Sequence, residues 1–491
     1  MRGCGQIRRG ALVAAICAAL AACGKLQDQP IRVAIIADPL APFATGPTPG
    51  PAATLLRGAT AEGLVSLDAD GKVIPALADR WIVTDDGLSY ILRMRDGTWA
   101  DGARLTGESA RAALQRAIAA QAGTPLGVDL RAIEEVRATA GRVIEVRLSR
   151  PVPDMLLLLA QPELGLRHHD RGDGPMSLTR EGTVALLQVI PPARLGMPAP
   201  EEAAASTRPL RFWALGGEAG VGAFAAGRVD ALLGGTYVDW PRVGGAGIAR
   251  ASVRVDPVAG MFGLEVLHHE GLLAIAQNRE AIAMSIDRAA LAARMGLPAW
   301  VTTSRVVSPG LPGDSGQVGE RWLDYDMENR HALAGPRIAA WVKLSGKPAH
   351  LRISMPAGPG SSLLTERLVI DLATIGITAE AVDEHAPADL KVVDVVARYQ
   401  RNTWFFSQMN CAARPAACNP DADALVLRGQ AAAGSDAQAL FAQAERAYAD
   451  ANDYIPLGLP IRWALAAPSL AGFAVNGWAY HPLRPLAGRL P

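Results

Sequence analysis

The strongest constraint on the fold is a helical pattern of apolar residues between two strand patterns in the last third of the chain. Four residues recur at the spacing of one helix face, namely Leu364, Leu368, Leu372 and Ile375. Gly376 follows, where a left-handed helix cap fits. Strand patterns cover 351–355 before the helix and continue from 377 after it. This order predicts a β-α-β unit, in which two parallel strands are joined by a helix.

Strand and helix patterns also alternate elsewhere. Strands are predicted at 31–36, 88–94 and 143–148, and a helix is predicted after the N-cap candidate Thr106. A chain of 491 residues exceeds the size at which a single core stops growing, so two or more domains are expected. Together these patterns predict an α/β protein with more than one sheet.

The charge balance argues against a nucleic-acid partner. Lys and Arg total 48 residues and Asp and Glu also total 48, which gives a formal net charge of zero. Proteins that bind nucleic acids usually carry a basic excess. We therefore expect no nucleic-acid partner, and we expect a monomer.

The N-terminus is typical of an exported chain. Arginines at positions 2, 8 and 9 precede an apolar run over 11–20, which is too short to span a bilayer. The run ends in Leu20-Ala21-Ala22-Cys23, which resembles the bacterial lipobox, although an ordinary signal peptide with a chance cysteine is the alternative. We predict that 1–22 is a signal peptide, that Cys23 is lipidated and that the protein is anchored to a membrane in the periplasm. Gly24 leaves the choice between inner and outer membrane open.

Two cysteines remain in the mature chain, Cys411 and Cys418. In an oxidising compartment a disulfide between them is the simplest interpretation. A zinc site is the alternative, but no histidine lies within the usual few residues.

Signals for an enzyme are weak. Residues 220–225 follow a predicted strand and match G-x-G-x-x-A, a fragment of a dinucleotide-binding pattern, but the next strand does not end in the acid that binds ribose. Neither G-x-S-x-G nor H-E-x-x-H occurs. The clusters at 168–170 and 268–270 each hold two histidines and an acid, yet adjacent residues of a strand point to opposite faces. We therefore predict no enzyme, no cofactor and no metal site.

A longer pattern carries a family resemblance. Glu62-Gly63-Leu64-Val65 opens it, and it continues through the Asp-Gly turns of 70–102 with Trp81 and Trp99 as packing anchors. Weaker matches follow at 172–176, 278–288 and 454–457. The pattern resembles the family 5 extracellular solute-binding proteins, the peptide- and oligopeptide-binding proteins of ABC importers.

The resemblance implies a two-lobed periplasmic-binding-protein fold, similar to type II, with an extra inserted domain. Lobe I is expected to comprise 23–57, 168–258 and 468–491, the inserted domain 58–167, and lobe II 259–467. The hinge is expected near 260–262 and 466–468. The implied function is to capture a peptide or other small solute between the lobes and deliver it to an ABC permease. A periplasmic sensor or assembly lipoprotein that reuses the fold is the alternative.

The resemblance also implies a ligand site. In lobe II the family has a tryptophan followed three residues later by an aspartate that pairs with the ligand's ammonium group; here Trp404 is followed by Ser407. A serine does not neutralise an ammonium group, so the identity of the ligand stays open. The residues expected at the ligand are Trp404, Phe406, Ser407, Thr236, Tyr237, Phe262 and Asp421. Core packing of a strand is the alternative for the aromatic residues 404–406.

Overall fold

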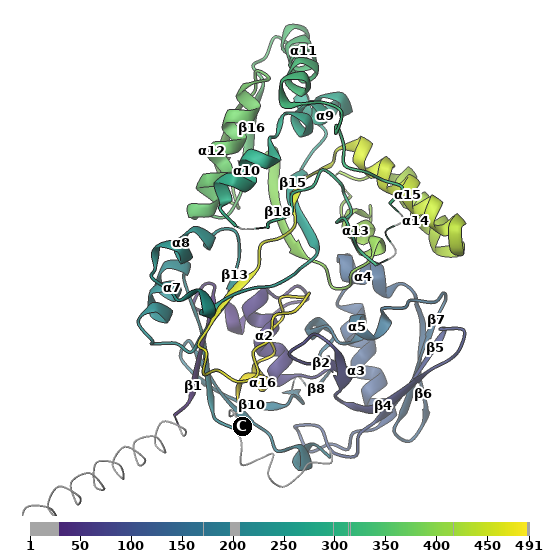
Figure 1. The fold of residues 1–491 in the computed structure, drawn as a ribbon. Helices are drawn as coiled ribbons and strands as arrows, with labels where there is room; N and C mark the ends of the chain where they lie inside the picture. Colours follow the sequence, from purple (N-terminus) through teal and green to yellow (C-terminus); the bar gives the residue numbers. More distant parts are fainter. Residues whose placement is uncertain are drawn as a thin grey trace, which may run out of the picture.

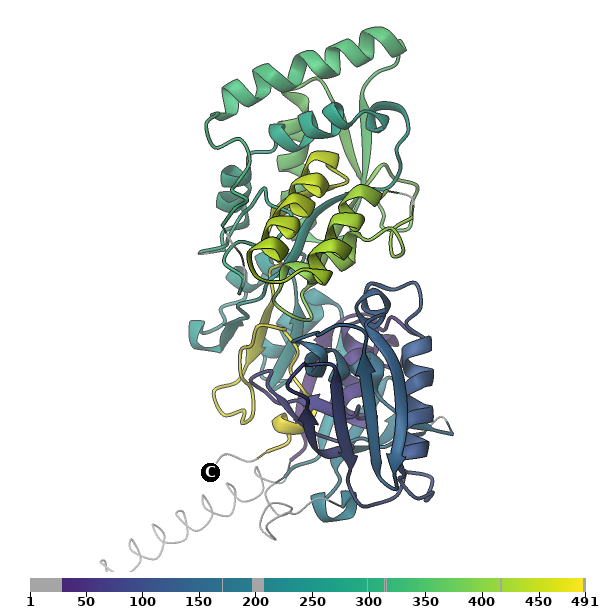
Figure 2. The ribbon, with the colours of Figure 1, turned by 90° about the vertical axis from the view of Figure 1, so that its right-hand side faces the viewer.

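The described part of the chain forms two bodies that share long connections (Figures 1 and 2). This computed structural model describes residues 29–488, apart from 170, 197–206, 298, 313, 315 and 416. The predicted signal peptide and Cys23 lie outside the described residues. Within the described ranges, no helix has the length and apolar character needed to cross a bilayer.

The first sheet has seven strands in the order β10-β11-β12-β1-β13-β20-β14. These strands are β10 (Met176–Glu181), β11 (Val184–Val189), β12 (Leu210–Leu215), β1 (Ile31–Ile36), β13 (Ala231–Gly235), β20 (Trp463–Ala466) and β14 (Val253–Val255). Strand β1 is parallel to both β12 and β13, and alternate β1 residues enter two different cores. Helices α2 (Pro51–Thr60) and α16 (Leu483–Leu486) pack on one face, and α7 (Gly217–Ala225) and α8 (Trp240–Gly245) pack on the other.

The second sheet has five strands in the order β17-β16-β18-β15-β19 and forms the upper body in Figure 1. Its strands are β17 (Thr378–Val382), β16 (His350–Ser354), β18 (Leu390–Val396), β15 (Gly260–Val266) and β19 (Tyr454–Gly458). Helices α10 (Arg288–Met295) and α12 (Pro359–Ala373) lie to the left of β15 and β18 in that view, and helices α9 (Ala276–Ser285) and α11 (Met327–Ser345) lie above them. Helices α13 (Asn402–Met409), α14 (Pro420–Ala431) and α15 (Gly434–Ala451) lie to the right.

The predicted β-α-β unit is confirmed. Strands β16 and β17 pair in parallel, with His350 opposite Thr378, and α12 joins them. The four apolar residues of the helical pattern are buried, and Gly376 has a φ of 83°, the left-handed region that suits glycine.

The third sheet lies within 58–167 and has the order β4-β5-β7-β6. Its strands are β4 (Ala78–Val83), β5 (Ser89–Met94), β7 (Val143–Leu148) and β6 (Ile133–Ala140), accompanied by α3 (Gly107–Ala119), α4 (Pro125–Leu130) and α5 (Met155–Leu159). Two short pairs, β2 (Val65–Leu67) with β3 (Val73–Pro75) and β8 (Arg167–His168) with β9 (Arg171–Gly172), flank this sheet. Thr106 caps α3 as predicted, because its side chain accepts a hydrogen bond from the Ser109 amide.

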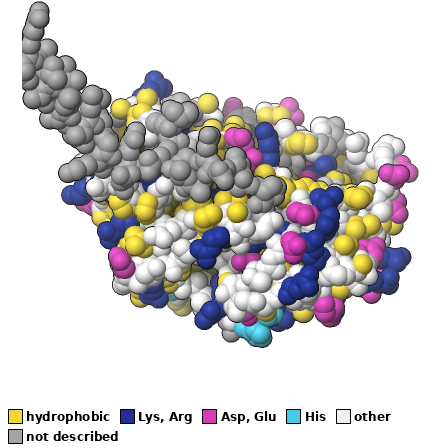
Figure 3. Space-filling model, turned by 90° about the horizontal axis from the view of Figure 1, so that it is seen from below, with side chains coloured by type: hydrophobic (Ala, Val, Ile, Leu, Met, Phe, Trp, Pro, Cys, Tyr) yellow, Lys and Arg dark blue, Asp and Glu magenta, His cyan; other side chains and the backbone are white. Residues whose placement is uncertain are grey.

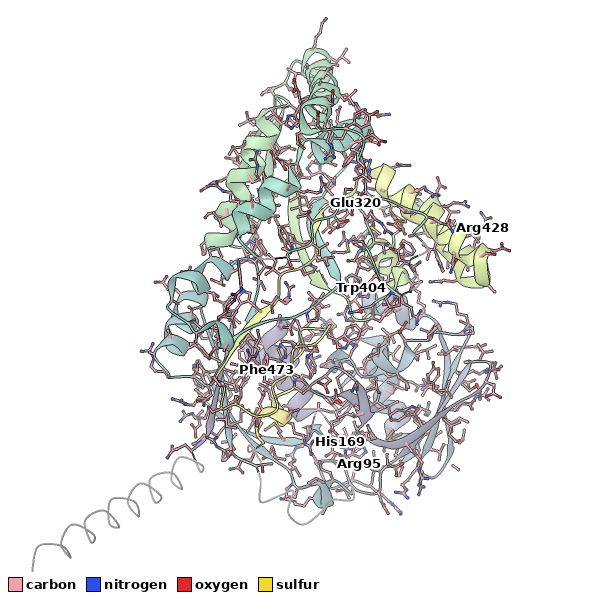
Figure 4. The ribbon with its side chains drawn as sticks, viewed as in Figure 1. Arg95, His169, Glu320, Trp404, Arg428 and Phe473 are labelled. Carbon is pink, nitrogen blue, oxygen red and sulfur yellow. A yellow bond between two sulfur atoms is a disulfide. The ribbon has the colours of Figure 1, made fainter. Side chains whose placement is uncertain are left out.

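A buried arginine joins this third sheet to its surroundings. Arg95, 1% exposed, directly follows β5 and donates to Glu62 and to Asp173, each at 2.8 Å. Burial raises the pKa of both carboxyl groups, and the Arg95 charge opposes that rise. The three residues come from distant parts of the chain, so their ion pairs hold these parts of the chain together. Arg95 is labelled in Figure 4.

The chain crosses between the seven-stranded and five-stranded sheets at 256–259 and at 459–462. The expected end of lobe II at 467 is therefore too late, because β20 pairs with β13 and β14 of the seven-stranded sheet. The second crossing also precedes the hinge expected near 466–468. The remaining lobe boundaries stay predictions.

Cys411 and Cys418 form a disulfide in the loop between α13 and α14, with their Cα atoms 5.1 Å apart. The Cys411 amide donates to the Asp423 carboxylate of α14 at 2.9 Å. The loop is therefore held against the helix that follows it.

We expect Arg95→Ala to lower the free energy of unfolding by about 3–5 kcal/mol, because it leaves two buried carboxylates without their cation. Urea unfolding of the full chain measures this. Arg111→Ala is the matched control, since it removes an exposed ion pair with Glu108 and should change little. Equal effects of the two substitutions would contradict the prediction.

Candidate functional site

A cavity of about 370 Å³ lies where the seven-stranded sheet meets the end of β18. Ile35 and Leu233 contribute apolar side chains from the first sheet, and 394–398 forms the opposite wall. The C-terminal segment 478–481 and the short helix η2 (Pro162–Leu164) complete it. We call this space the interlobe cavity. Its volume is in the range of sites that hold small solutes.

Two ion pairs border the interlobe cavity. Arg398 donates to the Glu163 carboxylate at 2.9 Å, and Arg462 donates to the Asp394 carboxylate at 2.7 Å. Arg462 also donates to the Asp394 carbonyl oxygen at 2.9 Å. Burial raises the pKa of Asp394, and the neighbouring Arg462 opposes this effect. Both arginines are therefore already engaged by carboxylates.

Two buried acceptor atoms beside the cavity have no hydrogen-bond partner among the described residues: Glu163 Oε2 and His481 Nδ1. The Glu163 side chain is 9% exposed and uses its other oxygen for Arg398. His481 lies 3.1 Å from Asp256 through Nε2. If that nitrogen carries the proton, Nδ1 is an acceptor. A buried acceptor without a donor is costly, so these atoms favour a ligand that supplies donors.

The sequence-predicted site residues are only partly brought together. Thr236 lines the interlobe cavity. Tyr237 is buried beside it, with its hydroxyl oxygen 3.4 Å from Ser361 Oγ and its ring against Phe262. Asp421 lies exposed in the first turn of α14. That position is consistent with a favourable charge at the helix N-terminus.

Trp404 and Phe406 lie on helix α13. The alternative for residues 404–406 was core packing of a strand, and these residues do not form a strand. Both are fully buried, and neither lines the interlobe cavity; Trp404 is labelled in Figure 4. Trp404 Nε1 is buried without a hydrogen-bond partner among the described residues, and Phe406 lines a second cavity. Their place at a ligand therefore stays a prediction.

Ser407 lines a different space, a cavity of about 690 Å³ between α4 and helices α13 and α14. Its hydroxyl donates to the Trp404 carbonyl oxygen at 2.7 Å and lies 3.4 Å from Asp129 Oδ2. Burial raises the pKa of Asp129 to about 7, while a hydrogen bond from the Tyr399 hydroxyl opposes the rise. Ser407 therefore faces a carboxyl group of the third sheet's domain.

One argument against a metal site is wrong. His168 and His169 were expected to point to opposite faces of a strand, but both Nδ1 atoms reach Asp101 Oδ2, at 2.7 and 2.8 Å. His169 has a φ of 47°, so the chain leaves the extended conformation there and strand alternation does not apply. At 268–269 the rings do diverge, toward Asp389 and Asp453.

Sequence reasoning missed Glu163, Asp394, Arg398, Arg462 and His481. Asp394 offered one signal, because it is a charged residue inside an otherwise apolar strand pattern. The others come from four separate segments, and no local pattern joins them.

Comparisons with known proteins bear on the family and the fold. Residues 72–183 match the profile described as "Bacterial extracellular solute-binding proteins, family 5 Middle". The "Probable deoxycholate-binding periplasmic protein YgiS" of Escherichia coli (strain K12) is 32% identical over 153 residues, which cover 26% of this chain and 28% of that protein. The chain thus matches under a third of that relative's length.

Similar solved structures cover almost the whole chain. OppA of Haemophilus influenzae, in complex with the peptide RPPGFSPFR, has a TM-score of 0.81 at 16% identity, covering 94% of this chain and 100% of that one. The murein tripeptide binding protein MppA of Escherichia coli has a TM-score of 0.78 at 16% identity, covering 94% and 98%. MppA is named as a binding protein, and OppA is described in complex with a peptide. The resemblance to the family 5 extracellular solute-binding proteins is confirmed, and this chain has the two-lobed α/β fold of their periplasmic members.

Proposed function

We propose that this protein is the substrate-binding lipoprotein of an ABC importer and captures a peptide or peptide-like solute in the interlobe cavity. The observation that carries the proposal is the position of this cavity, bordered by both sheets and beside the two crossing segments. Ligands favour such sites at domain interfaces. A solute held there touches both bodies, and the permease then receives the closed form.

The chemistry of the cavity favours a ligand with a protonated amine. Glu163 Oε2 is an acceptor, and His481 Nδ1 is one when Nε2 carries the proton, whereas Arg398 and Arg462 are paired with carboxylates. An ammonium group at Glu163 would form a charge-assisted hydrogen bond, which is about twice as strong as a neutral one. A ligand that bears only a carboxylate, such as the deoxycholate in the relative's name, would have to displace an existing ion pair. Glu163 thus supplies the carboxylate that position 407 lacks.

We expect the chain to bind dipeptides or tripeptides with a free N-terminus at least about tenfold more tightly than their N-acetylated forms, because a charged hydrogen bond contributes about 1.5–3 kcal/mol. Glu163→Gln should remove this preference. Titration calorimetry with matched free and acetylated peptides measures both. Ser407→Ala, in the other cavity, is the control and should leave affinity unchanged. Equal binding of free and acetylated peptides would show that Glu163 does not receive an ammonium group.

We expect Trp404→Ala to lower the free energy of unfolding by about 3–5 kcal/mol, because it opens a hole in a packed core. Peptide affinity of the folded fraction should stay within about twofold, since the ring does not line the interlobe cavity. Urea unfolding and calorimetry on the same preparation separate the two effects. A large loss of affinity with unchanged stability would instead assign the ring to the ligand site.

Membrane attachment is expected to depend on Cys23 alone. Cys23→Ala should move the protein from the membrane fraction to the soluble periplasmic fraction, because acyl chains on that cysteine supply the anchor. Fractionation followed by immunoblotting tests this, with Cys17→Ala as the control within the predicted signal peptide. An unchanged distribution of the Cys23 variant would rule out the lipid anchor.

A further inference from the structure

Three side chains converge at the end of the molecule opposite the five-stranded sheet. Asp101 lies in the turn 99–102 of the third sheet's domain, where the Gly102 amide donates to the Trp99 carbonyl oxygen. His168 ends β8, and His169 follows it. One ligand atom from each, a carboxylate oxygen or a ring nitrogen, lies within 4.8 Å of the others. His169 is labelled in the lower body in Figure 4, and Figure 3 shows histidine side chains on the face seen from below.

The cluster is held in place by its surroundings. Asp101 Oδ1 accepts a hydrogen bond from the Ala103 amide at 3.1 Å, which turns Oδ2 toward the imidazoles. The His168 ring stacks on Trp99 with the centroids 5.3 Å apart, and Trp99 Nε1 donates to Ser109 at 2.9 Å. Such outer contacts orient the ligands of metal sites.

The backbone at His169 is a second sign of a built site. Its φ of 47° lies in the left-handed region, which is uncommon for a non-glycine residue. This conformation directs a second ring nitrogen to the same carboxylate oxygen, 2.8 Å away. The chain thus adopts an unfavourable conformation that brings two imidazoles to one point, and strained residues of this kind often occur at functional sites.

We propose that Asp101, His168 and His169 bind a zinc ion. Two imidazole nitrogens and one carboxylate oxygen form a ligand set that Zn²⁺ accepts, with a fourth position left to solvent or an anion. Both histidines would exchange their hydrogen bonds to Asp101 for coordination through the Nδ1 lone pair, with the proton on Nε2. Arg116 and Arg167 line the same surface depression. The ion would tie the β8–β9 hairpin to the loop that carries Asp101.

The second histidine pair of the chain provides an internal comparison. His268 and His269 contact two different carboxylates, Asp389 and Asp453, at 3.1 and 2.7 Å. Their rings do not share a ligand point, so this pair should not form an equivalent site. His269→Ala is therefore a matched control for a paired surface histidine.

The test is titration of zinc chloride into the EDTA-treated full chain, produced without a polyhistidine tag, together with thermal unfolding. We expect one saturable site and a higher melting temperature with zinc, since the ion binds the folded chain. His168→Ala and Asp101→Asn should each weaken binding by at least about tenfold. His169→Gly is the safest variant for folding, because glycine suits the backbone at φ 47° while the imidazole is lost.

Either of two results would overturn the proposal. The first is the absence of saturable zinc binding by the wild-type chain, which would mean that the cluster is only hydrogen-bonded. The second is binding that is undiminished in His169→Gly and Asp101→Asn, whatever the effect of His269→Ala, which would place the zinc elsewhere. Circular dichroism of each variant confirms that it is folded before the titrations are compared.

Discussion

The buried contact of Arg95 with Glu62 and Asp173 is the interaction on which the arrangement of the lower body depends. Arg95 belongs to the third sheet's domain, Glu62 follows α2, and Asp173 follows β9. One cation between two carboxylates is tolerable in a core only while all three remain in place, because each charge has been removed from water. Such a contact contributes little net energy compared with apolar packing, but it excludes other ways of docking the inserted sheet.

The same contact determines where the cavity wall can lie. Glu163 lies on η2, and η2 packs against α2. Helix α2 ends at Thr60, shortly before Glu62 in the chain. The position of η2 therefore depends on how the inserted domain meets the seven-stranded sheet. From this position Glu163 accepts the hydrogen bond from Arg398, which follows β18 in the chain. A structural ion pair thus indirectly positions a residue of the proposed ligand site.

Much of the fold could be predicted because it rests on local patterns. The β16-α12-β17 unit followed from four apolar residues at helical spacing, and the hairpins of the inserted domain followed from Asp-Gly turns. The helix α13 could not be recognised in this way, because a run of Trp404, Phe405 and Phe406 is compatible with a buried strand or a buried helix. The histidine cluster escaped prediction for another reason: the left-handed conformation of a non-glycine residue has no sequence signature. The residues that line the interlobe cavity come from five or more distant segments of the chain. No local sequence pattern indicates that these segments meet in the fold.

The two crossing segments have a mechanical consequence. They run side by side, since Val255 pairs with Trp463 below them, Phe262 pairs with Gly458 above them, and the Asp256 amide donates to the Arg462 carbonyl oxygen at 3.0 Å. A two-stranded ribbon bends readily about one axis, whereas its paired strands oppose sliding and separation. The paired crossing segments therefore favour rotation of the two bodies about the ribbon over sliding along it. Arg462 lies within that ribbon, and its side chain donates to Asp394 in the cavity wall. A bend of the ribbon would therefore move the cavity wall together with the two bodies.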